Sequence, residues 1–132
     1  MPYITIDRRK AVLHDPRDWP KTSGELNFYI TTRALQPLDF PDEYFQRLIT
    51  DVIQHYWQDT TRYQTANDIV GAIECAVMEL QRRGVGEFVA SRSAILLRLK
   101  REFYFALVGP YEDTAIARNG DLEFYLKQKE VK

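Results

Sequence analysis

The stretch Ala94-Ile-Leu-Leu-Arg-Leu-Lys-Arg-Glu-Phe-Tyr-Phe-Ala-Leu-Val108 decides the fold, because it carries two apolar rows when it is read as a helix. One row consists of Ile95, Leu96, Leu99, Phe103, Ala106 and Leu107. At about 100° per residue, Leu97, Tyr104 and Val108 form a second row on roughly the opposite side. A helix that packs once in a small monomer needs a single apolar row. The second row predicts burial inside a bundle or against another subunit, which makes these three residues the candidate oligomer interface.

The composition is that of one soluble globular domain, which we expect to span residues 1–132. Apolar residues make up 45% of the chain and charged residues 28%, and the aromatic share of 13% argues against disorder. Lysine and arginine total 18 against 19 acidic residues, so the net charge of −1 provides no general attraction to nucleic acid. We therefore do not expect nucleic acid as a partner.

The features that indicate a cellular compartment favour the cytoplasm. Cys75 is the single cysteine, so no disulfide can form within the chain. No apolar run approaches the roughly 20 residues of a membrane span, so no membrane partner is expected. The segment 1–10 lacks the order of a signal peptide, in which basic residues precede an apolar stretch.

Four helices are predicted from apolar periodicity and from their end signals. The first spans about Glu25–Leu35, where Thr22 and Glu25 have the spacing of a capping box. The second begins near Pro41, a first-turn proline, and continues to Trp57. The third lies between an N-cap at Thr65 and the glycines at 84 and 86, and the fourth begins near Ser91 or Ser93 and ends before Pro110.

The two ends of the chain show weak alternation of apolar and polar residues. Tyr3–Ile6 could form a short strand, and Leu122, Phe124 and Leu126 alternate with Glu123 and Tyr125. A two-stranded ribbon of this kind needs a helix to lean on. The expected fold is therefore mainly α: a four-helix domain with ordered termini, with a short β ribbon between the N- and C-terminal segments as an option.

Several kinds of catalytic or metal site lack the residues that they require. His14 and His55 are the only histidines, and no HExxH, Glu-x-x-His or Cys/His cluster occurs. Zinc sites and ferritin-like iron sites therefore lack their ligands, and we expect neither a metal nor another cofactor. Ser91 and Ser93 lack the flanking pattern of a nucleophile elbow. No residue is predicted to be catalytic.

Two helical carboxylates leave a different chemistry open. Glu74 and Glu102 each flank the apolar row of their helix. If they face each other, they could bind a divalent metal or act as an acid and a base. The favoured alternative is that they form salt bridges between helices with Arg82, Arg98 or Arg101.

Positive charge gathers around the third and fourth predicted helices. The residues are Arg82, Arg83, Arg92, Arg98, Lys100 and Arg101, with Tyr104 and Phe105 nearby. Guanidinium groups can hold a phosphate while an aromatic ring stacks on an attached base. The favoured alternative is a solvated face on which acids and bases alternate.

Five pieces of the chain form an ordered set of motifs. They are Met1-Pro-Tyr-Ile, Gly24-Glu-Leu-Asn-Phe-Tyr-Ile-Thr, Asn67 with Gly71-Ala-Ile-Glu-Cys, Arg101-Glu-Phe-Tyr, and Pro110-Tyr-Glu-Asp-Thr-Ala-Ile-Ala-Arg-Asn-Gly-Asp. In these pieces the chain resembles a small uncharacterised family found in bacteria and their phages. It departs from that family where Gln81–Leu99 intervenes before the Arg101 piece. The resemblance implies a habitat rather than an activity.

The resemblance also directs attention to a set of polar and aromatic residues within these pieces. They are Asn27, Tyr29, Asn67, Glu74, Glu102, Tyr104, Tyr111, Glu112, Asp113, Asn119 and Asp121. Asn119-Gly120 is also a common helix terminator, and Glu112 and Asp113 also suit the first turn of a helix. The candidate ligand-binding residues are Asn27, Tyr29, Asn67, Glu74, Arg82, Arg83, Arg98, Arg101, Glu102, Tyr104, Tyr111 and Asp113.

The leading prediction is a non-enzymatic helical protein that self-associates, with a dimer favoured, and that acts by binding. Its bound partner would be a host protein or a phosphorylated small molecule, in keeping with a phage-related habitat. One alternative is a small enzyme that uses Glu74 and Glu102, with or without a divalent metal. Another is a structural component of a larger particle.

Overall fold

The computed structural model describes residues 4–15, 18–36, 41–59 and 63–120. The chain divides into two compact units, residues 1–101 and 102–132. The single domain expected over residues 1–132 stays a prediction. No helix in the described part of the chain is both long enough and apolar enough to span a bilayer.

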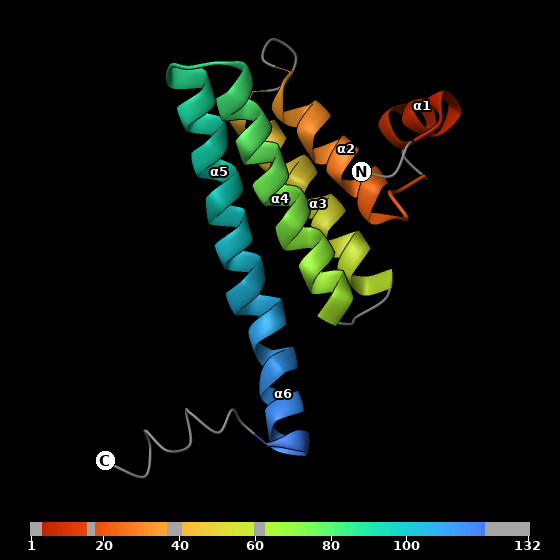
Figure 1. The fold of residues 1–132 in the computed structure, drawn as a ribbon, viewed down its shortest axis with the longest axis vertical. Coiled ribbons are helices and arrows are strands. Elements are labelled where there is room, and N and C mark those ends of the chain that lie inside the picture. The colour runs from red at the N-terminus through yellow and green to blue at the C-terminus, as the bar shows by residue number, and fades with distance from the viewer. Residues whose placement is uncertain (1–3, 16–17, 37–40, 60–62, 121–132) are drawn as a thin grey trace. The chain divides into compact units, whose positions relative to one another are not determined.

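The first unit consists of α1 (Ile6–His14), α2 (Ser23–Ala34), α3 (Asp42–Asp59), α4 (Tyr63–Arg83) and the greater part of α5 (Glu87–Phe103). In this unit, α2 and α3 pack against α4, and α1 packs against α2 (Figure 1). Helices α2 and α4 form the most extensive of these helix pairs. Helix α5 returns alongside α4, where the Nζ of Lys100 lies 3.0 Å from an Oε of Glu74.

The described chain is mainly helical, but the expected four-helix domain with a β ribbon is wrong. The expected N-terminal strand, Tyr3–Ile6, does not form at its described residues: Ile4 and Thr5 precede α1, which begins at Ile6. The Thr5 hydroxyl accepts a hydrogen bond from the Arg8 backbone N–H and caps this helix. No strand occurs among the described residues. The other half of the expected ribbon, residues 122–126, lies outside them.

Of two predicted N-cap residues, one is confirmed and the other is wrong. The Thr22 hydroxyl accepts from the Glu25 N–H at 3.1 Å, which confirms Thr22 as the N-cap of α2. Thr65 is not an N-cap, since α4 begins two residues earlier, at Tyr63, and Thr65 is buried within the helix. A side chain that is buried by neighbouring helices no longer follows the local capping preference of its type.

The second unit continues from α5 through a π-helical turn, Tyr104–Val108, into α6 (Gly109–Asn119). Helix α5 ends before Pro110, as predicted, but the helical backbone does not stop there. The π-helical turn interrupts the regular α ladder, so Pro110 falls in the first turn of α6, where its missing N–H does no harm. Gly120, with a φ of +92°, ends α6 through a hydrogen bond from its N–H to the Ile116 carbonyl at 2.8 Å.

The core is built from aliphatic side chains interleaved with very small ones. The larger buried side chains include Leu26, Ile30, Phe45, Ile49, Ile69, Ile73, Leu80 and Leu96. On α2 and α4 the buried small residues are Gly24, Ala34, Ala66, Ala72 and Ala76. Small residues allow two helix backbones to approach closely, which fits the extensive contact between α2 and α4.

One arginine lies inside the core and ties α5 to α3. The Arg92 side chain is only 2% exposed, and its guanidinium lies over the rings of Phe45 at 4.4 Å and Phe88 at 5.1 Å. Its Nε lies 3.2 Å from Asp42, which also accepts from the Ser91 hydroxyl. Burial lowers the pKa of Arg92, while the Asp42 charge opposes that shift. Aromatic faces and one carboxylate thus replace water around this cation.

Enlarging a small buried residue of α4 should destabilise the protein. Ala76→Leu adds three carbons at a fully buried position, and overpacking of this kind typically lowers the free energy of unfolding by about 1–3 kcal/mol. Thermal and urea unfolding measure the change. Ala117→Leu, at an exposed position of α6, is the matched control and should stay within about 0.5 kcal/mol. Equal effects of the two variants would contradict the packing described here.

Candidate functional site

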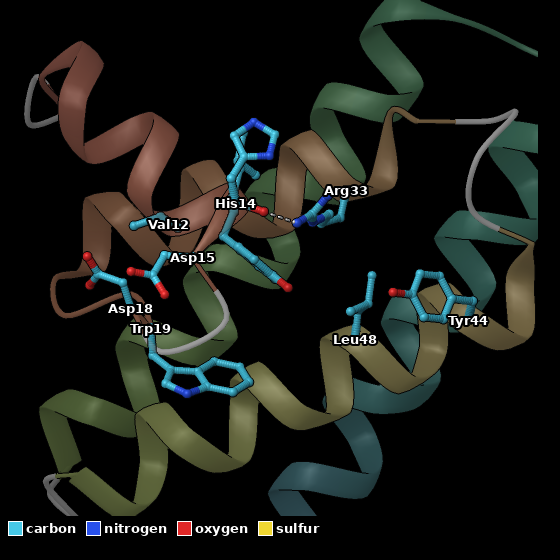
Figure 2. Close-up of a pocket in the computed structure, with 10 residues that line it drawn as sticks. Val12, His14, Asp15, Asp18, Trp19, Arg33, Tyr44 and Leu48 are labelled. Carbon is cyan, nitrogen blue, oxygen red and sulfur yellow. Dashed lines mark hydrogen bonds between the residues drawn. The ribbon is translucent and has the colours of Figure 1, made fainter.

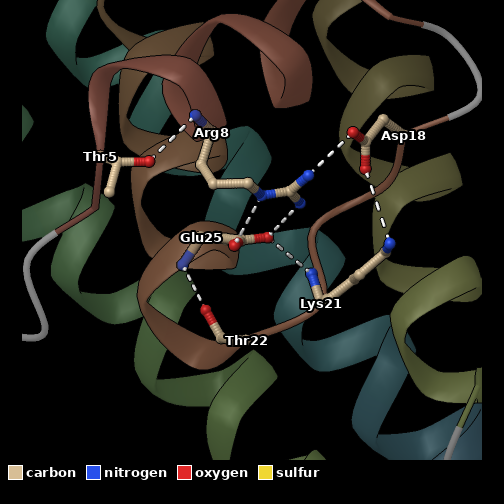
Figure 3. Close-up of polar contacts among 6 residues, drawn as sticks. All are labelled: Thr5, Arg8, Asp18, Lys21, Thr22 and Glu25. Carbon is tan, nitrogen blue, oxygen red and sulfur yellow. Dashed lines mark hydrogen bonds and ion pairs between the residues drawn. The ribbon is translucent and has the colours of Figure 1, made fainter.

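A forked hydrogen-bond cluster holds α1 against the beginning of α2 (Figure 3). The Arg8 guanidinium donates to both oxygens of Glu25, at 3.1 and 2.7 Å, and to Asp18 at 2.8 Å. The Lys21 backbone N–H also donates to Glu25, at 3.0 Å. Bidentate pairing between guanidinium and carboxylate is among the stronger polar contacts in proteins. The cluster therefore fixes where α1 lies.

The charges in this cluster stabilise one another. The hydrogen bonds from Arg8 are the main reason why the pKa of the Glu25 carboxyl lies below its usual value, and burial opposes that shift. The same contacts raise the pKa of Arg8, with the bond to Glu25 contributing most. Both groups are therefore fully ionised at neutral pH.

A second contact holds the other end of α1. The Nη2 of Arg33, on α2, donates to the Leu13 carbonyl at 2.6 Å, which satisfies a carbonyl in the last turn of α1. The Arg33 guanidinium also lies 5.1 Å from the centre of the Tyr29 ring. Helix α1 is thus tied to α2 at both of its ends.

Together these contacts leave a groove between α1, the segment that follows it, α2 and α3 (Figure 2). Its volume is about 240 Å³. The lining residues are Val12, Leu13, His14, Asp15, Asp18, Trp19, Tyr29, Arg33, Tyr44 and Leu48. Apolar and aromatic surface predominates, and one cation and two carboxylates stand among it.

The aromatic residues of the groove differ in how firmly they are held. Trp19 stacks on His55 of α3, with 3.8 Å between ring centres and 12° between ring planes. Tyr29 is buried, and burial is the main reason why the pKa of its hydroxyl is raised, so the phenol stays protonated at neutral pH. Tyr44 is exposed at the other end of the groove. Trp19 and Tyr29 are therefore fixed surfaces that a ligand can contact without ordering them first.

Among the predicted ligand-binding residues, only Tyr29 lines this groove. Asn27 lies on α2 and its side chain accepts from Thr31, and Asn67 is exposed on α4. Arg98 and Arg101 are exposed on α5. Four of the candidates belong to the second unit: Glu102, Tyr104, Tyr111 and Asp113. Asp121 lies outside the described residues.

Arg82 and Arg83 form an exposed cluster with Glu79. Arg82 donates to both oxygens of Glu79, at 3.1 and 2.9 Å, and Arg83 donates to one of them at 2.9 Å. The two guanidinium groups, Arg82 more than Arg83, lower the pKa of Glu79 to about 2. This arrangement resembles the predicted solvated face of alternating charges more than a phosphate site.

One prediction placed Glu74 and Glu102 face to face as a pair of carboxylates. In the structure, Glu74 forms an ion pair between helices with Lys100, which was not among the partners proposed for it. Glu102 follows two residues later on α5, which places it about 200° around that helix from Lys100. Among the described residues, no group of three or more His, Cys, Asp or Glu side chains is placed to hold a metal ion.

The predicted oligomer interface divides into exposed and buried parts. Leu97 is 42% exposed and Tyr104 is 48% exposed, whereas Val108 is 1% exposed. The wheel that aligned them assumed an α-helix throughout, but Tyr104–Val108 is a π-helical turn with more residues per turn. Each π-helical residue advances less around the axis, so Val108 does not follow Tyr104 at the angle that an α-helix would give.

Loss of the Glu25 charge should destabilise the protein at neutral pH and much less in acid. Because the folded pKa of Glu25 is lowered, its contribution is complete above the unfolded carboxyl pKa of about 4.3 and is lost as the pH falls through the folded value. Urea unfolding of Glu25→Gln should show a loss of about 2 kcal/mol near neutral pH and a smaller loss near pH ~3. Glu43→Gln, at an exposed position, is the control. A loss of equal size at both pH values would contradict the ion pair.

Comparison with known proteins gives the chain a family but no activity. Residues 1–94 match the family model described as a domain of unknown function, DUF6899. No curated protein and no solved structure matches the chain. The matched residues include those that line the groove, whereas the motif pieces that begin at Arg101 and Pro110 lie beyond them. The chain therefore belongs to the family of uncharacterised domains DUF6899.

Proposed function

We propose that the protein is a non-enzymatic binding protein, and that its groove between α1, α2 and α3 receives one large aromatic side chain of a partner protein. The observation that carries this proposal is the combination of the groove's size with its lining. The volume of about 240 Å³ is below the range of roughly 300–1,000 Å³ that is usual for pockets holding a drug-sized small molecule or cofactor. A single large side chain fits that space better than a nucleotide does.

The lining supports a protein partner rather than a small metabolite. Protein interfaces are enriched in tyrosine, tryptophan and arginine, and their binding energy concentrates where an anchor side chain fills a pocket. The groove contributes Trp19, Tyr29, Tyr44 and Arg33 in one place. Asp15 and Asp18 supply carboxylate oxygens that can accept a hydrogen bond from an indole N–H or a phenol O–H. These features favour an aromatic anchor that carries a donor, such as tryptophan or tyrosine.

The setting of the proposed interaction follows from the remaining features. Cys75 is an exposed free thiol, which fits a reducing compartment such as the cytoplasm. The resemblance to a family of bacteria and their phages makes a host protein a natural partner. A structural role in a larger particle would use the same groove as a docking point for a neighbouring subunit.

Titration with capped amino acids tests the proposal. N-acetyl-tryptophanamide should bind with a dissociation constant on the order of 1 mM, since a lone side chain lacks the rest of an interface. The shifts in ¹H–¹⁵N spectra should centre on Trp19, Tyr29 and Arg33. N-acetyl-alaninamide and adenosine monophosphate should cause no saturable shifts. Tight binding of the nucleotide, or no binding of the tryptophan probe, would refute the proposed function.

A matched pair of arginine substitutions on α3 separates the groove from the rest of the surface. Leu48→Arg places a long charged side chain in the groove, and the affinity for the tryptophan probe should fall at least about tenfold. Gln54→Arg introduces the same side chain at an exposed position of the same helix, outside the groove, and should leave the affinity unchanged. Circular dichroism establishes that both variants are folded. An equal effect of the two variants would contradict binding in the groove.

A further inference from the structure

Helices α4 and α5 each carry a large apolar side chain that is exposed to solvent. Met78 is 66% exposed and Leu97, on α5, is 42% exposed. The ion pair between Glu74 and Lys100 sets the register of the two antiparallel helices. Met78 lies one turn from Glu74, and Leu97 lies nearly one turn from Lys100 in the same direction, towards the connection at 84–86. The two exposed apolar side chains therefore lie at the same level of the α4–α5 pair.

Charged residues flank Met78 with opposite signs. Glu74, Met78 and Arg82 are spaced four residues apart on α4, so they form one row: acid, apolar, base. All three positions are exposed. When two copies of such a row are placed antiparallel around Met78, each acid lies beside the base of the other copy. The row is thus complementary to itself, as an interface with two-fold symmetry requires.

We propose that this face binds a second copy of the same chain, with the two α4 helices antiparallel and the two-fold axis at Met78. Met78 and Leu97 form the apolar centre, and Glu74 of each copy pairs with Arg82 of the other. This surface is separate from the α1–α2–α3 groove, so the dimer does not depend on the function proposed for that groove.

The ion pairs within each copy are compatible with this arrangement. Glu79 binds both Arg82 and Arg83, so it keeps Arg83 when Arg82 reaches the second copy. Glu74 has a second carboxylate oxygen besides the Oε1 that lies near Lys100.

Charge reversal tests this pairing directly. Sedimentation equilibrium should show the wild-type chain as a dimer, while Glu74→Arg and Arg82→Glu should each raise the dimer dissociation constant at least about tenfold, because each homodimer then holds two like-charged pairs. An equimolar mixture of the two variants should recover the dimer, since every cross-pair is again of opposite sign. Only contact between residues 74 and 82 of different copies predicts this rescue.

Three results would overturn the proposal. They are a wild-type chain that stays monomeric up to about 100 µM, single variants that dimerise as tightly as the wild type, and a mixture that shows no recovery. A monomeric wild type would leave the face to a different protein, and an unchanged dimer would place the interface elsewhere. Both substituted positions are exposed and circular dichroism reports folding, so loss of the dimer is distinguishable from loss of the fold.

Cysteine cross-linking tests the position of the axis. In a Cys75→Ser background, Met78→Cys brings the two sulfur atoms together at the two-fold axis, where a disulfide should form on mild oxidation. Asn67→Cys is the matched control on the same helix. At about 1.5 Å per residue, position 67 lies about 16 Å from the axis along α4, so its two copies are too far apart to bridge. Cross-linking of the control alone, or of both variants equally, would contradict an axis at Met78.

Discussion

The fork of hydrogen bonds from Arg8 to Glu25 and Asp18 is the contact on which the candidate site depends. Helix α1 is short and has one fully buried apolar side chain, Val12, so apolar burial alone does little to fix its position. The fork and the bond from Arg33 to the Leu13 carbonyl hold the helix at its two ends instead. One wall of the groove exists because these polar contacts position α1, and the other walls come from helices of the main core.

The sequence predicted the parts of the fold that local patterns determine. The helices observed as α2, α3 and α4 match the predicted segments to within a few residues, because each carries an apolar row at helical spacing and a recognisable beginning or end. Helix α1 was not among the four predicted helices, and only a helical turn over Arg8–Leu13 was expected there, since its own apolar pattern is weak and its main contact joins residues that are 17 positions apart in the chain. The phase of the last predicted helix was wrong beyond Tyr104 because the π-helical turn changes the angle per residue.

The groove could not be predicted from the sequence for a related reason. Its lining comes from α1, the segment after it, α2 and α3, and no single stretch contributes more than a few of these residues. Trp19 lies outside any helix and belongs to no periodic pattern. Its position is fixed by stacking on His55, which is distant from it in the sequence. Tyr29 was a candidate ligand-binding residue because it lies in one of the family motifs, and not because its neighbours in the sequence indicated a groove. A signal that was available is the tryptophan itself, which is seldom placed in a loop without a partner.

The proposed binding groove and the proposed dimer face both lie within residues 1–94, apart from Leu97 and Lys100. In this account, a dimer presents two grooves, and a partner that offers two aromatic anchors binds more tightly than either groove alone allows. The dimer would thus gain avidity for such a partner without any additional contact surface. The second unit, residues 102–132, has no part in either proposal.

Binding of an aromatic side chain in the groove is tested most directly by locating bound N-acetyl-tryptophanamide through intermolecular nuclear Overhauser effects to methyl groups of the protein. Val12 and Leu13 on α1 and Leu48 on α3 contribute methyl groups to different walls of the groove. Binding in the groove predicts contacts from the indole protons to both walls in the same complex. Contacts to one wall only, or to methyl groups of α4 and α5 instead, would contradict the groove as the binding site.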